Sequence, residues 1–472
     1  MSRTSYDLIV LGSGPAGEKG AAVAAYFGKK VALVERLLPL VGGACTNTGT
    51  LPSKTMRESA LALTGMMSRG LEAAVLAMPK PYSGATLLFR EHLVVESERR
   101  RIRKNLEREG IDVFAGIGSF VDAHTVQVKP PDGSEARALN GEVILVATGT
   151  RPYRPPYIPF EAVEVYDSDE ILAIETIPES MIVLGSGVIA SEYACIFAAL
   201  GVKVTMMDGR ERLLEFLDRE MGDRFTAELR RLGLTLRLGD SPVSCAIDEK
   251  TRICTVGTKS GHAESAQALV ASSGRSGNVE DLNLAAIGIV PDKRGNIAVD
   301  AQFRTAVSNV YAAGDVIGFP GLASTSMEQG RLAVIHAFGF ASGRRLAPIF
   351  PYGIYTIPEL SYVGASEEDL RKRGADYVVG EAFMRDNGRG LILGAESGVL
   401  KLIVAPDRKI LGVHILGPSA TELIHVGAMA MTQGATIDLF VDAVFNYPTL
   451  SELYKYAAYD AHAALQRRSV SW

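Results

Sequence analysis

The sequence predicts an α/β protein that contains two parallel-sheet domains of the same kind, and three observations favour this class. Residues 8–17 form an apolar strand that opens onto a Gly-x-Gly-x-x-Gly turn, and a helix of small residues and a second strand follow. The same pattern returns at residues 183–208. The 472 residues leave room for about three domains of ~150 residues each. Because such strand–turn–helix units bind dinucleotides, two Rossmann-like dinucleotide-binding domains are predicted.

Each glycine of the first unit, and the acid that follows, has a physical role. Gly12 makes the tight turn, Gly14 lets the backbone approach a pyrophosphate, and Gly17 lets helix and strand pack closely. The helix N-terminus presents free N–H groups and a positive dipole end to the phosphates. Glu35 ends the second strand, where it can accept hydrogen bonds from a ribose diol.

The second unit repeats these positions at one constant offset. Gly185 and Gly187 correspond to Gly12 and Gly14, and Asp208 corresponds to Glu35. The third glycine is replaced by Ala190, which is still small enough for close packing. A second dinucleotide site is therefore predicted.

The loop after Asp208 carries both signs of charge. Asp208 suits the 2′,3′-diol of NAD and repels the 2′-phosphate of NADP, whereas Arg210 and Arg212 could bind that phosphate. The loop thus predicts a site that takes both nucleotides. For either arginine alone, a solvated side chain is the competing interpretation.

Composition excludes several other classes of function. The net charge of −5 gives no polybasic surface for nucleic acid. No secretory signal and no apolar run long enough to span a membrane is recognised, so cytoplasmic localisation is expected. Four cysteines suit a reducing compartment, and three of them are expected to be small buried hydrophobes: Cys195, Cys245 and Cys254.

Residues 42–54 resemble the redox segment of the two-cysteine flavoprotein disulfide reductases. The segment keeps Gly43, Cys45 and a Pro-Ser-Lys ending at Lys54, but Thr50 stands where the second cysteine belongs. One sulfur cannot form a disulfide with a hydroxyl. The frame of a disulfide reductase is therefore present without its dithiol.

Two further strands that end in glycine turns extend the resemblance to the pyridine nucleotide-disulfide oxidoreductases. The first ends at Thr148 and Gly149, the second at Asp315, and Ala323 follows where family members close over the flavin. The resemblance implies bound FAD, with a nicotinamide nucleotide at the second unit, and no metal. The implied FAD residues are Gly12, Gly14, Gly17, Glu35, Gly43, Cys45, Lys54, Thr148, Gly149, Asp315 and Ala323. The implied NAD(P) residues are Gly185, Gly187, Ala190, Asp208, Arg210, Arg212 and Gly274.

The same resemblance implies the order of the domains. Residues 1–150 are expected to bind FAD, residues 151–275 to bind NAD(P), residues 276–346 to complete the FAD domain, and residues 347–472 to form an α+β dimerisation domain. A homodimer or larger homo-oligomer follows. The charged stretch 91–109 is expected to be a long solvated helix.

The catalytic base of the two-cysteine enzymes is also replaced. Tyr447 occupies the position of the family's histidine, and with Glu452 it is expected to form a packed interface pair. Lys54 and Glu192 match the lysine–glutamate pair that family members place near flavin N5, which makes them the implied catalytic residues. For Glu192, an ordinary surface charge remains the alternative.

The features that break the reductase pattern resemble the soluble pyridine nucleotide transhydrogenases. These features are Thr50 and the stretches 210–218, 274–278 and 445–449. The resemblance implies FAD-dependent, ping-pong hydride transfer between NADPH and NAD, of the Si-specific type. An NAD(P)H diaphorase or quinone reductase of the same fold, or a catalytically silent FAD-binding subunit, remains an alternative. The physiological direction of transfer stays open.

Overall fold

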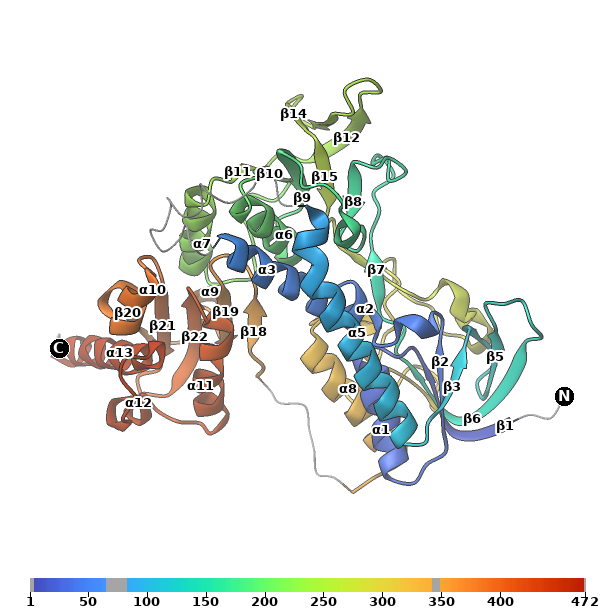
Figure 1. Cartoon of the computed structure of the whole chain (residues 1–472). Coiled ribbons are helices and arrows are strands. Elements are labelled where there is room, and N and C mark those ends of the chain that lie inside the picture. The colour runs from blue at the N-terminus through green and yellow to red at the C-terminus, as the bar shows by residue number, and fades with distance from the viewer. Residues whose placement is uncertain (1–3, 65–82, 342–348, 471–472) are drawn as a thin grey trace.

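A computed structural model describes residues 4–64, 83–341 and 349–470. Three larger sheets follow one another along the chain, and Figure 1 shows the C-terminal one set to one side of the first two. This architecture confirms the predicted class: two dinucleotide-binding units, the first with a mixed sheet and the second with a parallel one, and a C-terminal α+β unit. The exact domain boundaries stay a prediction.

The first sheet has seven strands in the order β3-β2-β1-β6-β5-β4, with β17 paired to β6. Its strands are β1 (Thr4–Leu11), β2 (Val31–Glu35), β3 (Asp112–Ala115), β4 (Ile117–Asp122), β5 (Thr125–Lys129), β6 (Arg137–Val146) and β17 (Val310–Ala312). Strand β17 lies far along the chain yet pairs in parallel with β6, Val310 opposite Ile144. The chain thus returns to its first sheet after building the second.

Helices α1 (Pro15–Tyr26) and α8 (Ala323–Ala337) lie side by side against this sheet. Their close approach depends on a glycine. A Cβ added to Gly330 would lie 2.1 Å from the carbonyl oxygen of Ala16. The helix that follows the glycine turn is therefore held by a segment more than 300 residues away.

Helix α5 (Gly84–Arg108) contains nearly all of the charged stretch 91–109, for which the sequence predicts a solvated helix. It begins earlier than expected, and one of its faces is buried, including Val95, Ile102 and even Glu91. The solvated interpretation is therefore wrong for that face, because apolar residues recur there at helical spacing. On the other face the charges pair with each other, as in Arg101 with Glu98.

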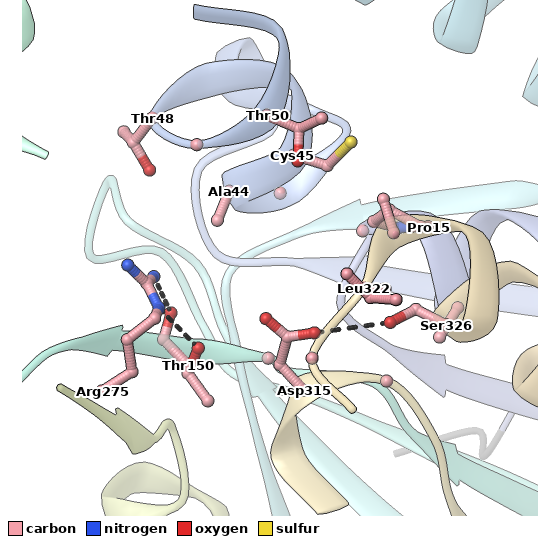
Figure 2. A pocket seen from close by; sticks show the side chains of 18 of the residues that line it. Pro15, Ala44, Cys45, Thr48, Thr50, Thr150, Arg275, Asp315, Leu322 and Ser326 are labelled. Carbon is pink, nitrogen blue, oxygen red and sulfur yellow. Dashed lines mark hydrogen bonds between the residues drawn. The ribbon is translucent and has the colours of Figure 1, made fainter. Parts of the chain in front are cut away.

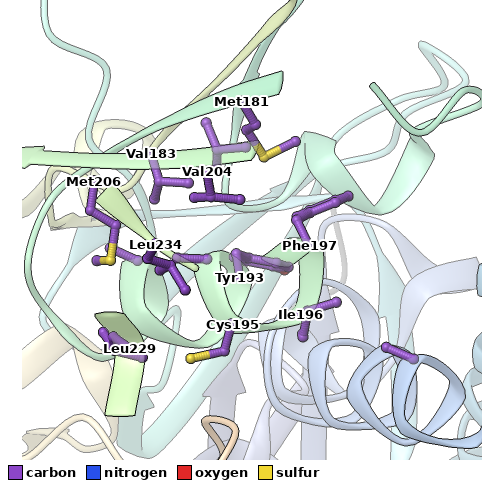
Figure 3. Close-up of a cluster of buried hydrophobic side chains, with 14 of the residues drawn as sticks. Met181, Val183, Tyr193, Cys195, Ile196, Phe197, Val204, Met206, Leu229 and Leu234 are labelled. Atoms are coloured by element: carbon purple, nitrogen blue, oxygen red, sulfur yellow. The ribbon is translucent and has the colours of Figure 1, made fainter. Parts of the chain in front are cut away.

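The second sheet has five parallel strands in the order β11-β10-β9-β15-β8. Its elements are β8 (Val165–Asp167), β9 (Ser180–Leu184), α6 (Val188–Ala199), β10 (Lys203–Asp208), α7 (Arg219–Arg231), β11 (Thr235–Leu238) and β15 (Ala268–Ala271). Figure 3 shows apolar side chains of α6, among them Phe197, packed against strands β9 and β10, which contribute Val183 and Met206. The buried helix between two parallel strands is the expected dinucleotide-binding arrangement.

Two small sheets complete this part of the chain. They are the antiparallel β12 (Pro242–Ile247), β13 (Cys254–Thr258) and β14 (Ala263–Ala266), and the ribbon of β7 (Thr150–Pro152) with β16 (Arg275–Gly277). Cys195 and Cys254 are buried as predicted. Cys245 is only half-buried, because β12 lies at the edge of its sheet with one face toward solvent.

The C-terminal unit is an antiparallel sheet of five strands in the order β18-β19-β22-β21-β20. Helix α13 packs on β20 and β21, and α11 packs on β22 and β19. The elements are β18 (Tyr352–Ile354), β19 (Leu360–Gly364), α9 (Glu367–Lys372), β20 (Val378–Phe383), α10 (Gly388–Leu393), β21 (Val399–Val404), β22 (Ile410–Leu416), α11 (Ala420–Thr432), α12 (Asp438–Asp442) and α13 (Leu453–Val470). Among the helices of the described ranges, none is long and apolar enough to cross a membrane.

Candidate functional site

One large cavity, about 1780 Å³, runs between the first two units and reaches the C-terminal unit. It is larger than the ~300–1000 Å³ typical of a site for one drug-sized ligand. Most of the predicted site residues line it: Gly12, Gly14, Glu35, Gly43, Cys45, Lys54, Thr148, Gly149, Gly187, Glu192, Arg210, Gly274, Asp315 and Ala323. Five others do not: Gly185 belongs to the second glycine turn, Gly17 and Ala190 pack behind the two turns, and Asp208 is bonded by Arg210. Arg212 also lies away from the wall.

The first glycine turn has the shape that phosphate binding requires. Gly12 has a φ of +103°, and a Cβ there would lie 2.5 Å from the carbonyl oxygen of Ala147. A Cβ on Gly17 would lie 1.9 Å from the carbonyl oxygen of Gly12. Gly14 instead faces open space, with only the Cα of Gly43 within 4 Å of an added Cβ. The backbone therefore forms a cradle at the N-terminus of α1.

The acid at the end of β2 is held in place. Glu35 accepts hydrogen bonds from the amide (2.9 Å) and the hydroxyl (2.6 Å) of Ser13, and from the amide of Leu37 at 3.0 Å. The Ser13 hydroxyl in turn accepts one from the amide of Gly42 at 3.0 Å. The turn, the acid and the start of the redox segment are thus joined in one network.

Asn47 organises the redox segment, and the sequence interpretation missed it. Its amide donates to the carbonyl oxygens of Leu40 (2.7 Å), Val41 (3.2 Å) and Gly43 (2.8 Å), and its own oxygen accepts from Arg99 at 2.7 Å. An asparagine so close to Cys45 in a glycine-rich segment was the available signal, since its side chain readily bonds nearby backbone groups.

Cys45 on the short helix α2 (Gly43–Asn47) lies close to Thr50, the first residue of the longer helix α3 (Thr50–Thr64), as Figure 2 shows. Burial raises the pKa of the Cys45 thiol, and a hydrogen bond with the Thr50 hydroxyl opposes that rise only in part. All four cysteines are free. The site therefore holds a neutral thiol beside a hydroxyl, where a reductase would hold a reactive dithiol.

The cavity also presents polar atoms without partners. The hydroxyl of Thr148 is buried, lines the cavity and has no hydrogen-bond partner. Asp315 lines the cavity opposite the redox segment, and Ser326 donates to it at 3.4 Å (Figure 2). An orphaned hydroxyl, an accessible carboxylate and the glycine cradle fit a flavin dinucleotide.

Lys54 and Glu192 form a direct ion pair, with the ammonium 2.7 Å from the carboxylate. The other oxygen of Glu192 accepts the amide N–H of Tyr355 at 2.9 Å, and the ammonium lies 5.1 Å from the centre of the Tyr355 ring. The Glu192 side chain is only 5% exposed. The surface-charge interpretation of Glu192 is therefore wrong, because the C-terminal unit covers it.

The second glycine turn repeats the first. Gly185 has a φ of +121°, and a Cβ there would lie 2.6 Å from the carbonyl oxygen of Ser272. It would also lie 3.3 Å from the Cβ of Ala190, so the turn and the start of α6 pack closely here as well. Gly187 faces open space at the N-terminus of α6, and Ser272, which contacts the turn at Gly185, has a buried hydroxyl without a partner. These groups fit a second dinucleotide.

The mixed-sign loop separates the two arginines. Arg210 chelates the carboxylate of Asp208 with Nε at 3.1 Å and Nη2 at 2.7 Å. Burial favours the neutral acid, but the bonds from Arg210 keep the pKa of Asp208 below its ordinary value. Arg212 turns away and donates to the carbonyl oxygen of Arg219 at 3.0 Å. Arg210, not Arg212, therefore faces the cavity.

An unexpected polar cluster joins the two units on the cavity wall. Arg275 donates to the hydroxyl and the carbonyl oxygen of Thr150, both at 2.8 Å (Figure 2), and contacts Asp169 at 3.4 Å. Burial raises the pKa of Asp169, while Arg275 and Thr48 oppose that rise. The signal for Asp169 was its place just after strand β8, at the carboxyl edge of a parallel sheet.

The expected interface pair consists of an exposed tyrosine and a bonded acid. Tyr447 is 71% exposed, and Glu452 accepts a hydrogen bond from Asn387 at 3.4 Å. Their role at an interface stays a prediction.

Comparison with known proteins agrees with this geometry. The family model for pyridine nucleotide-disulphide oxidoreductase matches residues 6–330, and the model for the dimerisation domain of that family matches residues 350–458. The chain is 46% identical over 456 residues to a protein named soluble pyridine nucleotide transhydrogenase from Mycobacterium tuberculosis, covering 96% of this chain and 97% of the relative. It is 40% identical over 462 residues to one of the same name from Colwellia psychrerythraea, with 96% and 97% covered.

Solved structures of related proteins share the fold. LpdA from Mycobacterium tuberculosis superposes with a TM-score of 0.87 at 26% identity, over 97% of this chain and 99% of that one. The HOCl-induced flavoprotein disulfide reductase RclA from Escherichia coli superposes with a TM-score of 0.85 at 28% identity, over 95% and 98%. The chain therefore belongs to the pyridine nucleotide-disulphide oxidoreductase family, whose members bind FAD and NAD(P).

Proposed function

We propose that this chain is an FAD-dependent NAD(P)+ transhydrogenase of the Si-specific type, which transfers a hydride between NADPH and NAD. One observation carries the proposal: a single cavity joins both dinucleotide units beside the Lys54–Glu192 pair, while Thr50 replaces the sulfur that thiol chemistry would need. The names of the relatives support the same activity. A bound FAD would supply the two-electron chemistry by taking a hydride from one nicotinamide and giving it to another.

The chain contributes charge and position. The ammonium of Lys54 is held by Glu192, which the amide of Tyr355 fixes in turn. A fixed positive charge in a partly buried site favours negative charge that develops beside it. Because the pair bridges α3 and α6, it also holds the two dinucleotide units at one spacing.

Further parts of the proposal concern the nucleotides and the assembly. Arg210 binds the 2′-phosphate of NADPH, and Asp208 binds the ribose diol of NAD, with the other predicted site residues in the roles given above. The match to a dimerisation domain supports a homodimer or larger homo-oligomer. A cytoplasmic location belongs to the proposal as well.

Hydride exchange between NADPH and a thio-analogue of NAD tests this function. The purified FAD-loaded protein should reduce the analogue with no other acceptor present. NADPH deuterated at one face of C4 and then at the other should show which hydrogen moves, which tests the Si-specific type. NADPH oxidation that needs a quinone or dye would indicate a diaphorase instead, and a protein that binds FAD but oxidises neither nucleotide would be a silent subunit.

A further inference from the structure

We propose that Ser186 is a positioning residue for nucleotide choice. Its hydroxyl donates a hydrogen bond to the carboxylate of Asp208 when Arg210 leaves that carboxylate to bind a 2′-phosphate. The inference deepens the proposed function, and it rests on that function only in requiring one site to accept both NADP and NAD.

The first observation is an unused hydroxyl. Ser186 is completely buried (0% exposed), and its hydroxyl makes no hydrogen bond of acceptable geometry. A buried polar group without a partner is uncommon in folded proteins and calls for an explanation. Burial raises the pKa of the Asp208 carboxyl and the bonds from Arg210 lower it, and the Ser186 hydroxyl lies close enough to help lower it.

The second observation is the internal repeat, which offers a built-in comparison. Ser13 occupies in the first unit the position that Ser186 occupies in the second. There the serine hydroxyl donates to the acid of its own unit, Glu35, at 2.6 Å. In the second unit the corresponding acid, Asp208, is bonded by Arg210 instead. The second unit therefore has the same two groups, a serine hydroxyl and an acid, that form a hydrogen bond in the first.

The third observation is how Arg210 holds the acid. Asp208 accepts from the amide (2.8 Å), Nε (3.1 Å) and Nη2 (2.7 Å) of Arg210, and its side chain is only 14% exposed. The Arg210 side chain is 50% exposed and lines the cavity. The arginine can therefore turn toward a ligand, whereas the carboxylate stays near the turn that carries Ser186.

The two nucleotides then make different demands on the loop. A 2′-phosphate carries up to two negative charges and pairs best with a planar guanidinium, so it competes with Asp208 for Arg210. The released carboxylate is largely buried, and it would face a like charge without any side-chain hydrogen-bond donor unless the hydroxyl of Ser186 bonded it. NAD has no such phosphate, so Arg210 stays on Asp208 and the hydroxyl of Ser186 is not needed. Ser186 should therefore support NADP binding and leave NAD binding unchanged.

Calorimetric titration of the FAD-loaded protein with NADP+ and, separately, with NAD+ measures this difference without turnover. Ser186→Ala should weaken NADP+ binding by about fivefold or more, the scale expected for a hydrogen bond to a charged group, and change NAD+ binding less than about twofold. Ser191→Ala is the matched control. Its hydroxyl is also fully buried and unpaired, but it lies on α6 and is not one of the groups that act on the carboxyl of Asp208. It should change neither affinity.

A second background distinguishes positioning from a general packing effect. In an Asp208→Ala protein there is no carboxylate for the hydroxyl to receive, so adding Ser186→Ala should no longer weaken NADP+ selectively. Equal losses for both nucleotides, no loss for NADP+, or a selective loss that persists without Asp208 would each overturn the inference. Selective NADP+ weakening in a protein that shows no hydride exchange would keep the inference and refute the transhydrogenase proposal.

Discussion

A buried lysine joins the second unit to the C-terminal unit, and its removal should be strongly destabilising. Lys401 on β21 has no exposed surface. Its ammonium donates to Asp218 (2.9 Å), Glu220 (2.9 Å) and Glu367 (2.6 Å), which lie at the starts of α7 and α9. The three carboxylates have oxygens within 4.8 Å of one another, the spacing of a cation site, and the ammonium occupies it.

The magnitude follows from what Lys401→Met leaves behind. Asp218 is 1% exposed and Glu367 15% exposed, so at least two carboxylates would lose their shared cation while remaining largely out of water. Removing one partner from a buried ion network costs about 3–5 kcal/mol. We expect a loss of that size in the free energy of the unfolding transition that involves the contact between the two units.

The pH dependence has a definite sign. Burial opposes the charged form of both acids. In the intact protein His414 and Lys401 hold the pKa of Asp218 below its ordinary value, and Arg224 and Lys401 do the same for Glu220. Their stabilisation is thus present above the unfolded pKa of about 4 and lost at lower pH. Without Lys401 the folded pKa values should rise above the unfolded ones. The deficit of the variant should therefore be full near neutral pH and narrow as pH falls toward about 5.

Urea unfolding at neutral pH and at about pH 5, followed by circular dichroism and flavin fluorescence, measures both effects. Lys409→Met is the matched control, since Lys409 is 60% exposed and pairs only with the exposed Asp407 among the described residues. It should lose no more than about 1 kcal/mol. A Lys401→Met loss as small as that of the control, or a deficit that does not narrow in acid, would refute this account of the network.

Three further predictions concern the site. The purified protein should be yellow with non-covalent FAD, since the Gly12 turn and Asp315 face one cavity, and failure to take up FAD on reconstitution would remove the basis of the proposed function. Cys45→Ser should keep most hydride exchange, because Thr50 offers no sulfur, whereas a hundredfold loss, about 2.7 kcal/mol, would reveal a chemical role for the thiol. With one artificial acceptor, Arg210→Ala should lower kcat/KM for NADPH at least about tenfold more than kcat/KM for NADH, and Asp208→Asn should have the reverse preference. Arg212→Ala should change little, because its side chain bonds Arg219. Equal effects on both nucleotides would mean that the loop is a solvated charge cluster.

The sequence by itself determined the features that depend on short, contiguous patterns. The glycine turns at Gly12 and Gly185 have positive φ in the structure and admit no Cβ, so their role could be predicted from spacing. The α/β class followed for the same reason. The absence of a dithiol needed only the identity of residue 50, since no fold can give a threonine a sulfur.

Only the tertiary structure decided which side chains meet. Arg210 and Arg212 look alike in sequence, yet one faces the cavity and the other bonds the start of α7. From sequence alone Glu192 could be a surface charge, but in the structure the C-terminal unit buries it. The contacts of Lys401 with Asp218 and Arg275 with Thr150 join segments more than 100 residues apart. No local pattern encodes such contacts, because they form only when separate sheets pack together and exclude water.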